Sequence, residues 1–359
     1  MAGLLAAAAV LLAGLPAQAV APLDPLPQIN AKGVVVWQGY DLSISRYQIY
    51  RYDPKKSEFA NISQNTDNNF NPQINDKGQV VWYGNPSNQV YLWDPKTPES
   101  TNIPNSDGAY SPLINAHGVV VWQGYDGVHY QIYRWDPKTG EIDNLSQNSY
   151  DNRYPRINAK GQVVWELDES SHISAIYRWD PKIGGIGVDI SNNNPESYSP
   201  QINAKGQVVW FAYDGTHDQI FLRAAKGDAI EKISESLNCQ NFSPQINAKG
   251  QAVWLAYAGA WPGQIARWDS KKGAANISNS GNWCSFPQIN AKGVVVWQEL
   301  VASANQIYRW DPKAHTPTNI SNNALDNQRP QINAKGQVVW QVWDGAQWLV
   351  YLDGVQIWP

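Results

Sequence analysis

One phrase returns eight times along this chain of 359 residues. It consists of Ile-Asn, two further residues, Gly, and an apolar run that ends on Trp. A repeat of about 40 to 50 residues without helical periodicity is typical of a β-propeller, in which each repeat forms one four-stranded blade. The sequence therefore predicts an all-β fold with eight blades. The copies begin 40 to 45 residues apart, at Ile29, Ile74, Ile114, Ile157, Ile202, Ile246, Ile289 and Ile332.

Each repeat can be read as four strands, A to D, and the third repeat illustrates the pattern. Strand A is predicted over 111–115, with Pro112 marking its entry because Pro cannot donate to a sheet ladder. A tight Asn-x-x-Gly turn leads to strand B over 119–122, whose continuous apolarity is expected of a sheet covered on both faces. Strand C is expected over 131–135 and the outer strand D over 142–146. A blade built in this way is one continuous stretch of chain.

The repeats fill the chain from residue 27 to about 358, which favours one propeller domain over 20–359. Because the first repeat begins with strand A and the last ends in the strand D position, the ring is expected to close without a shared strand. Seven blades with an appended unit are the alternative, and they would leave sheet edges and an apolar face exposed.

The first nineteen residues resemble a secretory signal peptide. An uncharged apolar stretch over 4–15 precedes Pro16 and the small-x-small sequence at 17–19, so cleavage is expected before Val20. No later apolar stretch is long enough to span a bilayer. The sequence thus predicts a secreted or periplasmic monomer.

Net charge restricts the choice of partner. The chain has 27 basic and 31 acidic residues, a formal charge of −4, and no run of Lys or Arg. Nucleic acid is excluded as an expected partner. A protein or a polysaccharide remains as the expected partner.

The repeat resembles the TolB-type, WD-like propeller repeats of bacterial envelope proteins. The resemblance rests on Pro-Gln-Ile-Asn-Ala-Lys-Gly, Val-Val-Trp, Gln-Ile-Tyr-Arg-Trp-Asp-Pro-Lys and Asn-Ile-Ser, with Asn-Ala-Lys-Gly where that family usually has Ser-Pro-Asp-Gly. It implies a propeller fold and an interaction module of the cell envelope or extracellular space.

Most of the 18 Trp residues are expected to be structural. Eight end strand B and five end strand C, and a residue repeated at one register is best explained by packing between blades. The Asn-x-Ser sequons at Asn61, Asn144, Asn276 and Asn319 likewise coincide with strand D.

Blade geometry places the B–C and D–A loops on one face. His129, His172 and His217 lie in B–C loops that should be about 12 Å apart, too far for a shared zinc ion. The D–A loops should be only about 6 Å apart between blades, which matches the Cα separation of a disulfide. A disulfide between Cys239 and Cys284 is therefore predicted for an exported chain, with two free thiols as the alternative. Six D–A loops carry a carboxylate, interpreted either as turn capping or as a ring that holds Ca²⁺: Asp24, Asp67, Asp107, Asp151, Glu196 and Asp326.

No sequence motif of a hydrolase, a metalloprotease or a nucleotide-binding protein is present. Function is therefore expected where the eight copies differ on the loop face. Glu166, Asp168 and Glu169 are an acid/base candidate, with a solvated edge as the alternative. Three Trp residues are predicted to escape the repeat pattern and to bind a ligand, together with three loop tyrosines: Trp261, Trp343, Trp348, Tyr125, Tyr213 and Tyr257.

Two functions follow from these residues. The first is an exported, non-catalytic propeller that binds a protein or a polysaccharide and needs no cofactor, unless Ca²⁺ occupies the acidic ring. The second is a propeller hydrolase or lyase that acts on glycans, with carboxylates around the central funnel. Two carboxylates that converge in the funnel with shifted pKa values would favour the enzyme.

Overall fold

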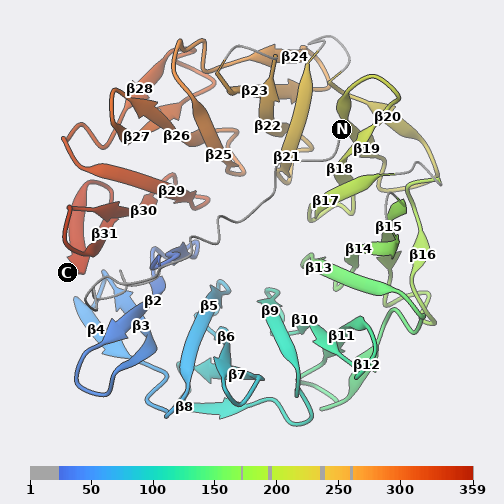
Figure 1. Ribbon diagram of the computed structural model, residues 1–359, viewed down its shortest axis with the longest axis vertical. Helices are drawn as coiled ribbons and strands as arrows, with labels where there is room; N and C mark the ends of the chain where they lie inside the picture. The colour runs from blue at the N-terminus through green and yellow to red at the C-terminus, as the bar shows by residue number, and fades with distance from the viewer. Residues whose placement is uncertain (1–23, 171–172, 193–195, 235–238, 259–261, 359) are drawn as a thin grey trace, which may run out of the picture.

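The chain forms a ring of eight four-stranded antiparallel sheets (Figure 1). The computed structural model describes residues 24–170, 173–192, 196–234, 239–258 and 262–358, and those residues contain no helix. The prediction of an eight-bladed β-propeller is confirmed, and all eight blades belong to the ring.

The strands of each blade follow one another in the sequence and in the sheet. Blades 1 to 4 are β1 (Gln28–Ile29), β2 (Val35–Asp41), β3 (Arg46–Asp53) and β4 (Glu58–Asn61); β5 (Asn68–Ile74), β6 (Val80–Asn85), β7 (Gln89–Asp94) and β8 (Thr97–Asn102); β9 (Ala109–Ile114), β10 (Val120–Tyr125), β11 (Tyr130–Trp135) and β12 (Ile142–Asn144); and β13 (Asp151–Ile157), β14 (Val163–Ser170), β15 (Ile173–Trp179) and β16 (Val188–Asp189).

Blades 5 to 8 repeat this order. Their strands are β17 (Ser197–Ile202), β18 (Val208–Tyr213), β19 (Asp218–Arg223) and β20 (Ile230–Lys232); β21 (Gln240–Ile246), β22 (Ala252–Tyr257), β23 (Gln264–Asp269) and β24 (Gly273–Asn276); β25 (Cys284–Ile289), β26 (Val295–Val301), β27 (Ala304–Trp310) and β28 (Pro317–Asn319); and β29 (Asp326–Ile332), β30 (Val338–Trp343), β31 (Trp348–Leu352) and β32 (Val355–Trp358). In each blade these four strands are A to D, and the four sequon Asn residues end strand D as predicted.

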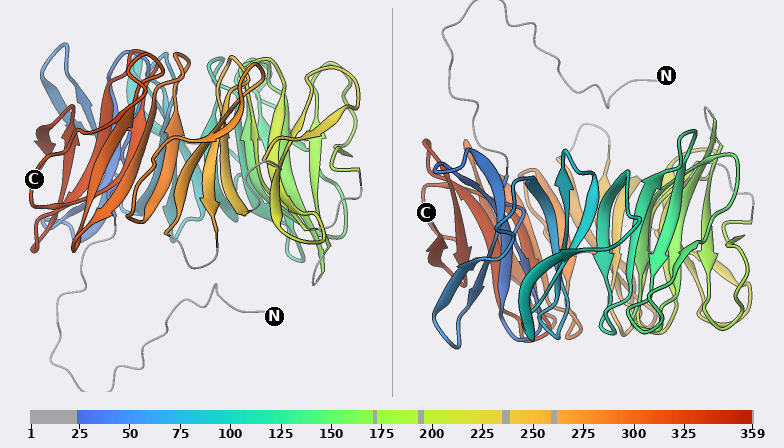
Figure 2. Two further views of the ribbon diagram at one scale, coloured as in Figure 1. Left: turned by 90° about the horizontal axis from the view of Figure 1, so that it is seen from above. Right: turned by 90° about the horizontal axis from the view of Figure 1, so that it is seen from below.

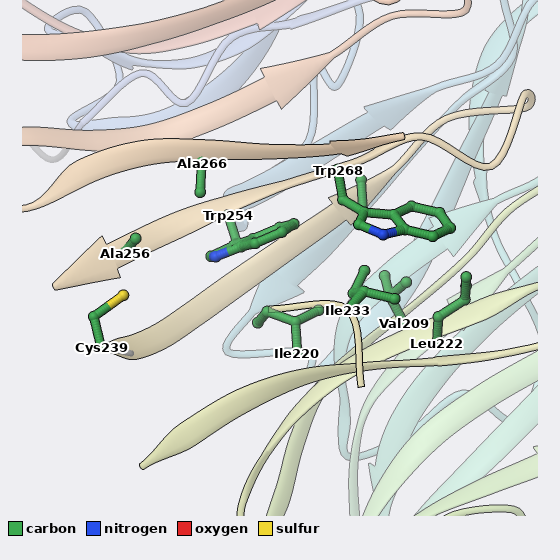
Figure 3. Close-up of a cluster of buried hydrophobic side chains, with 10 residues drawn as sticks. Val209, Ile220, Leu222, Ile233, Cys239, Trp254, Ala256, Ala266 and Trp268 are labelled. Atoms are coloured by element: carbon green, nitrogen blue, oxygen red, sulfur yellow. The ribbon is translucent and has the colours of Figure 1, made fainter. Parts of the chain in front are cut away.

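Packing between adjacent blades explains the repeated apolar residues. The eight Trp residues of strand B are at most 1% exposed, and each belongs to a cluster that joins two blades. Figure 3 shows such a cluster, in which Val209 and Ile220 of blade 5 contact the side of blade 6 that carries Trp254. Burial of large aromatic side chains stabilises the ring by the hydrophobic effect, so most of the Trp content is indeed structural.

In seven of the eight blades strand A is longer than predicted and contains its Pro, whereas in blade 1 strand β1 begins after Pro27. In blade 3 the strand is Ala109–Ile114, and a register shift opposite Trp122 marks a β-bulge at Ser111 and Pro112. The residue before Pro has a φ of about +50° in every blade, for example +50° at Ser111 and +53° at Tyr154. The prediction that Pro marks the strand entry was wrong, because the bulge takes Pro out of the ladder and removes the need for its N–H.

A ring of asparagine side chains surrounds the channel. In each A–B turn the Asn amide donates to the backbone carbonyl of the corresponding Asn in the next blade, at 3.0–3.2 Å. The last of these bonds joins Asn333 to Asn30. Blades 8 and 1 also share a cluster in which Val350 and Trp358 pack with Trp37. The ring therefore closes face to face without a shared strand, as predicted.

Candidate functional site

The ring has two faces that differ in their connections (Figure 2). Antiparallel strands that run A to D bring the B–C and D–A loops to one face, which we call the loop face, and the A–B and C–D turns to the other, the turn face. In blade 3 the loop face contains residues 126–129 and the turn face contains residues 115–119 and 136–141.

The residue after each strand B Trp connects neighbouring blades. In blades 1, 3, 7 and 8 it is a Gln whose side-chain carbonyl accepts the N–H of the bulge residue in the next blade, at 2.8–3.2 Å. In blade 4 the residue is Glu166, which accepts the N–H of Ser199 in the same way. Blades 2, 5 and 6 have Tyr83, Phe211 and Leu255 instead. Glu166 is thus the one carboxylate at a register otherwise occupied by neutral side chains.

Burial raises the pKa of Glu166 to about 7. The Ser199 N–H and the positive charge of Arg156 oppose this shift, because both favour the ionised form. Glu166 is half-buried and Asp168 is exposed. The alternative of a solvated edge therefore fits Asp168 and not Glu166.

Arg156 is a second departure from the repeat in the same blade. The residue before the repeated Ile lines the central channel, whose cavity volume is about 500 Å³. Leu113 and Arg156 replace the Gln found at the other six positions, so that Arg156 brings a charge into a ring of amides. The six Gln residues are Gln28, Gln73, Gln201, Gln245, Gln288 and Gln331.

Arg156 and Glu166 line one cavity of about 800 Å³ between blades 4 and 5. Asp218 lies on the same cavity, and burial together with the negative charges of Glu196 and Asp214 raises its pKa. The cavity thus has two carboxylates biased toward the protonated form and one guanidinium. It can donate a proton and hold an anionic or hydroxyl-rich group. Its remaining lining residues are Tyr154, Tyr198, Ser199, Pro200 and Phe211.

A line of seven aromatic rings crosses the loop face of blades 1 to 3. Consecutive ring centroids are 5.1–6.2 Å apart, and the rings come from the ends of strands A, B and C that reach this face. Arg153 of blade 4 ends the line, with its guanidinium 4.8 Å from the ring of Tyr130. Tyr40 and Tyr125 are exposed and the other rings are half-buried. The line consists of Tyr40, Tyr47, Phe70, Tyr83, Tyr110, Tyr130 and Tyr125.

Only one of the predicted ligand-binding residues lies in this line, namely Tyr125. Trp343 and Trp348 pair across strands B and C with their rings 5.3 Å apart, at the register of Tyr125 and Tyr130. The prediction that these two Trp residues escape the repeat was therefore wrong. Trp261 lies outside the described residues.

The two remaining predicted tyrosines make local contacts elsewhere on the loop face. The hydroxyl of Tyr213 donates to the carbonyl of Gly215, at 2.9 Å. The ring of Tyr257 lies 5.6 Å from that of Trp283. The loop face thus has several small aromatic groups besides the long line.

The acidic D–A residues do not converge. Asp67 and Asp107 lie seven residues before the repeated Ile, whereas Asp151, Glu196 and Asp326 lie six before it. The two sets are therefore offset by one residue in the repeat. Within the described residues no group of three or more His, Cys, Asp or Glu side chains is placed to hold a metal ion. Donors of the protein itself engage these carboxylates, as when Asp326 accepts the backbone N–H of Asn305 at 2.8 Å.

The structure has two free thiols instead of the predicted disulfide. Cys239 lies seven residues before its repeated Ile and Cys284 five before its own, so the two are not equivalent. Each is buried in a different cluster between blades. The prediction was wrong because it treated two offset positions as one register.

Sequence reasoning missed Arg156 and the continuity of the aromatic line. The signal for Arg156 was present, since Pro-Arg-Ile-Asn departs from the Pro-Gln-Ile-Asn of most repeats. The aromatic line had no such signal, because its members come from different strands in different blades.

The protein is a β-propeller, and comparisons with known proteins support that fold. No protein-family model and no curated protein matches the sequence. The β-propeller domain of the Trilobed protease from Pyrococcus furiosus matches with a TM-score of 0.55 and 14% identity, over 83% of this chain and 94% of that one. An oligogalacturonate lyase in complex with manganese matches with a TM-score of 0.58 and 13% identity, over 94% and 98% of the two chains.

Other matches are longer proteins. The chain spans 57–66% of the length of two Pyrococcus horikoshii acylaminoacyl peptidase structures and of a puromycin hydrolase. TolB from Acinetobacter baumannii matches with a TM-score of 0.45 and 12% identity, over 81% of this chain and 77% of that one. At these identities the likeness extends to the propeller fold alone.

The described residues include no helix long and apolar enough to cross a membrane.

Proposed function

We propose that this propeller is an exported module that binds a neutral polysaccharide through its loop face. The observation that carries the proposal is the line of seven aromatic rings over blades 1 to 3. Half-exposed aromatic rings offer an apolar surface with polar edges, which suits the alternating apolar and hydroxyl surfaces of a sugar chain. A line that continues over three blades suits a polymer better than a single sugar.

The charge of the loop face favours a neutral chain over an acidic one. Exposed carboxylates lie beside the aromatic line in the loops of blade 3, namely Asp107 and Asp126. An ionised carboxylate only accepts hydrogen bonds, so it pairs with sugar hydroxyl donors and repels a polyanion. The proposed ligand is therefore a glycan without acidic groups.

Affinity electrophoresis through gels that contain soluble neutral polysaccharides tests this proposal, supported by a glycan array. We expect Tyr110→Ala and Tyr125→Ala each to weaken binding by about tenfold, since stacking on an aromatic ring contributes about 0.5–1.5 kcal/mol beyond its buried area. Tyr213→Ala is the matched control, because Tyr213 is 40% exposed on the same face but lies outside the line. Failure of the native protein to bind any glycan would refute the proposed binding of a polysaccharide and would leave a protein as the expected partner.

The cavity between blades 4 and 5 supports a second function, glycan hydrolysis or elimination. Glu166 has a pKa of about 7, and burial also raises the pKa of Asp218 on the same cavity. Two carboxylates with shifted pKa values therefore share a cavity, although it lies between blades 4 and 5 and not in the central funnel where they were expected. A general acid with a pKa near 7 can protonate a leaving oxygen at neutral pH. Release of reducing ends from bound polysaccharide, abolished by Glu166→Gln, would establish this activity. Unchanged polymer length after long incubation would exclude it for the glycans tested.

Export through residues 1–19 is part of the proposal. Sequencing of the mature N-terminus from secreted or periplasmic material tests it, with Val20 as the expected first residue.

A further inference from the structure

Lysine is distributed unevenly over the two faces of the ring. Sixteen of the 17 lysines lie in A–B or C–D turns, and all sixteen are exposed. Lys232, the remaining one, ends β20 and pairs with Asp214 at 3.0 Å. The lysines of the turn face are Lys32, Lys77, Lys160, Lys205, Lys249, Lys292 and Lys335 in A–B turns, and Lys55, Lys56, Lys96, Lys138, Lys182, Lys226, Lys271, Lys272 and Lys313 in C–D turns.

The seven A–B lysines form an inner ring around the mouth of the channel. Six of them donate from Nζ to the backbone carbonyl of the corresponding residue in the next blade, at 2.9–3.4 Å. A carbonyl partner fixes the ammonium group without neutralising its charge. The A–B turns contain a single carboxylate, Asp76. The inner ring is therefore strongly positive.

The C–D lysines form an outer ring that carboxylates compensate in part, as in the pair Lys56–Glu58 at 3.8 Å. These turns contain Asp residues, but strand C arginines already occupy them, as in Arg51–Asp53 at 3.0 Å and Arg267–Asp269 at 3.2 Å. Arg134 pairs with Asp136 and with Asp143 in the same manner. The arginines pair with much of the negative charge, so the outer ring has a small excess of positive charge, and the inner ring carries most of the positive charge of the turn face.

The loop face has the opposite sign. Fourteen described carboxylates lie in its loops or at the strand ends that reach it, and its cations are few. The formal charge of −4 thus conceals a molecule with one positive and one negative face. The carboxylates are Asp24, Asp41, Asp67, Asp107, Asp126, Asp151, Asp168, Glu169, Asp189, Glu196, Asp214, Asp218, Asp326 and Asp344.

We propose that the turn face docks on an anionic lipid surface. The A–B and C–D turns lie on one face of the disc (Figure 2), so the inner and outer rings of lysines present their positive charge on the same side. An extended planar partner can approach all of them at once, whereas a linear polyanion would meet only part of them. Each Lys near an anionic membrane surface contributes about 1 kcal/mol of attraction. The acidic loop face is repelled by the same surface, so the protein docks in one orientation, with the aromatic line directed outward.

Sedimentation with vesicles tests this docking on the full chain. The vesicles contain phosphatidylcholine alone or phosphatidylcholine with one quarter phosphatidylglycerol. We expect binding to the anionic vesicles only, and loss of binding as NaCl rises from 50 mM to 500 mM, because salt screens exposed charges. The triple variant K160Q/K205Q/K249Q removes three inner-ring charges from consecutive blades and should weaken binding by about a hundredfold, from the attraction per Lys above.

The matched control adds the same change in net charge to the other face. The triple variant L42E/V128E/Q347E places three carboxylates at exposed B–C positions, and it should retain vesicle binding. Equal losses of vesicle binding in both triple variants would refute the proposal that the protein docks through its turn face. Binding of the native protein to soluble alginate but not to anionic vesicles would overturn the lipid partner in favour of an acidic polysaccharide. Thermal unfolding of both variants shows whether they are folded, and the salt dependence of the native protein tests the proposal independently of either variant.

Discussion

Asn333 donates its side-chain amide to the backbone carbonyl of Asn30 at 3.0 Å and so joins the last blade to the first across 303 positions of the sequence. Seven equivalent bonds join the other neighbours, for example from Asn203 to the carbonyl of Asn247 at the same distance. The closing contact therefore has the same chemistry as an internal one. Ring closure is achieved by repetition and needs no shared strand.

Asn333→Ala should lower the free energy of unfolding by about 1–3 kcal/mol. It removes the amide that bonds to the Asn30 carbonyl of the neighbouring blade and the side-chain oxygen that accepts the N–H groups of Lys335 and Gln337. Asn203→Ala is the matched control and should lower it by a similar amount, if the ring unfolds as one cooperative unit. Urea unfolding followed by Trp fluorescence measures both. A loss several kcal/mol larger at Asn333 would show that the closing interface is the weakest in the ring.

Glu166→Gln should stabilise the protein at high pH only. The folded pKa of about 7 lies above the unfolded value of 4.5. The folded state therefore binds the proton more tightly, and stability falls as pH rises from about 4.5 through 7. Gln keeps the acceptor for the Ser199 N–H and removes the charge. The expected gain is up to about 3 kcal/mol at pH 8.5 and near zero at pH 4.5.

Glu141→Gln is the control for that experiment, since Glu141 is exposed in a C–D turn. It should change stability little at either pH. A gain for Glu166→Gln that does not vary with pH would contradict a buried carboxyl that titrates near neutrality.

The blades could be predicted from the sequence because their order follows from the spacing of the repeats, and a register error of one or two residues does not change that spacing. The geometry of the site could not be predicted in this way, because it depends on the exact register. Arg156 and Glu166 meet at one cavity only because the bulge in strand A changes which side chains share a face. The Cys239 and Cys284 positions differ by two residues in the repeat, which a comparison of loops did not resolve. Single-residue offsets thus decide contacts that a pattern of 43 residues cannot specify.

Blade 7 replaces the usual Asn partner of the strand B Trp. In blade 6 Asn241 accepts the indole N–H of Trp254 at 2.7 Å, whereas Cys284 occupies that register in blade 7. The buried Glu299 accepts the N–H of Trp297 there, at 3.3 Å. Glu299→Ala should therefore destabilise the protein by about 1–3 kcal/mol, since a buried donor loses its partner.

The double variant C284N/E299A rebuilds the arrangement of blade 6, which has Ala256 in the position of Glu299. It should recover most of the stability lost in Glu299→Ala. Chemical denaturation of the two variants and of Cys284→Asn completes the double-mutant cycle. Additive losses would indicate that Glu299 does not serve as the indole acceptor.

The reactivity of the thiols tests whether Cys239 and Cys284 are free, as in the structure, or form the predicted disulfide. Burial raises the pKa of Cys284 to about 12, and burial also raises that of Cys239. Since the thiolate is the reactive form, neither thiol should react quickly with Ellman's reagent at pH 8 in the native protein. When the protein is unfolded in guanidinium chloride without a reductant, two thiols per chain should react with the reagent. Their absence there would show that a disulfide had formed.

Gly187 lies against the indole of Trp165, one of the large side chains that fill the contacts between blades. A Cβ built on Gly187 would lie 2.0 Å from Trp165 Cη2, so alanine cannot be accommodated without displacing a fully buried ring. Gly187→Ala should destabilise the protein by at least about 1–3 kcal/mol through overpacking. Gly281→Ala is the control, because its Cβ would meet nothing within 4 Å, and it should change stability by less than about 1 kcal/mol. Equal melting temperatures for the two variants would mean that the blade 4 interface can rearrange around the added methyl group.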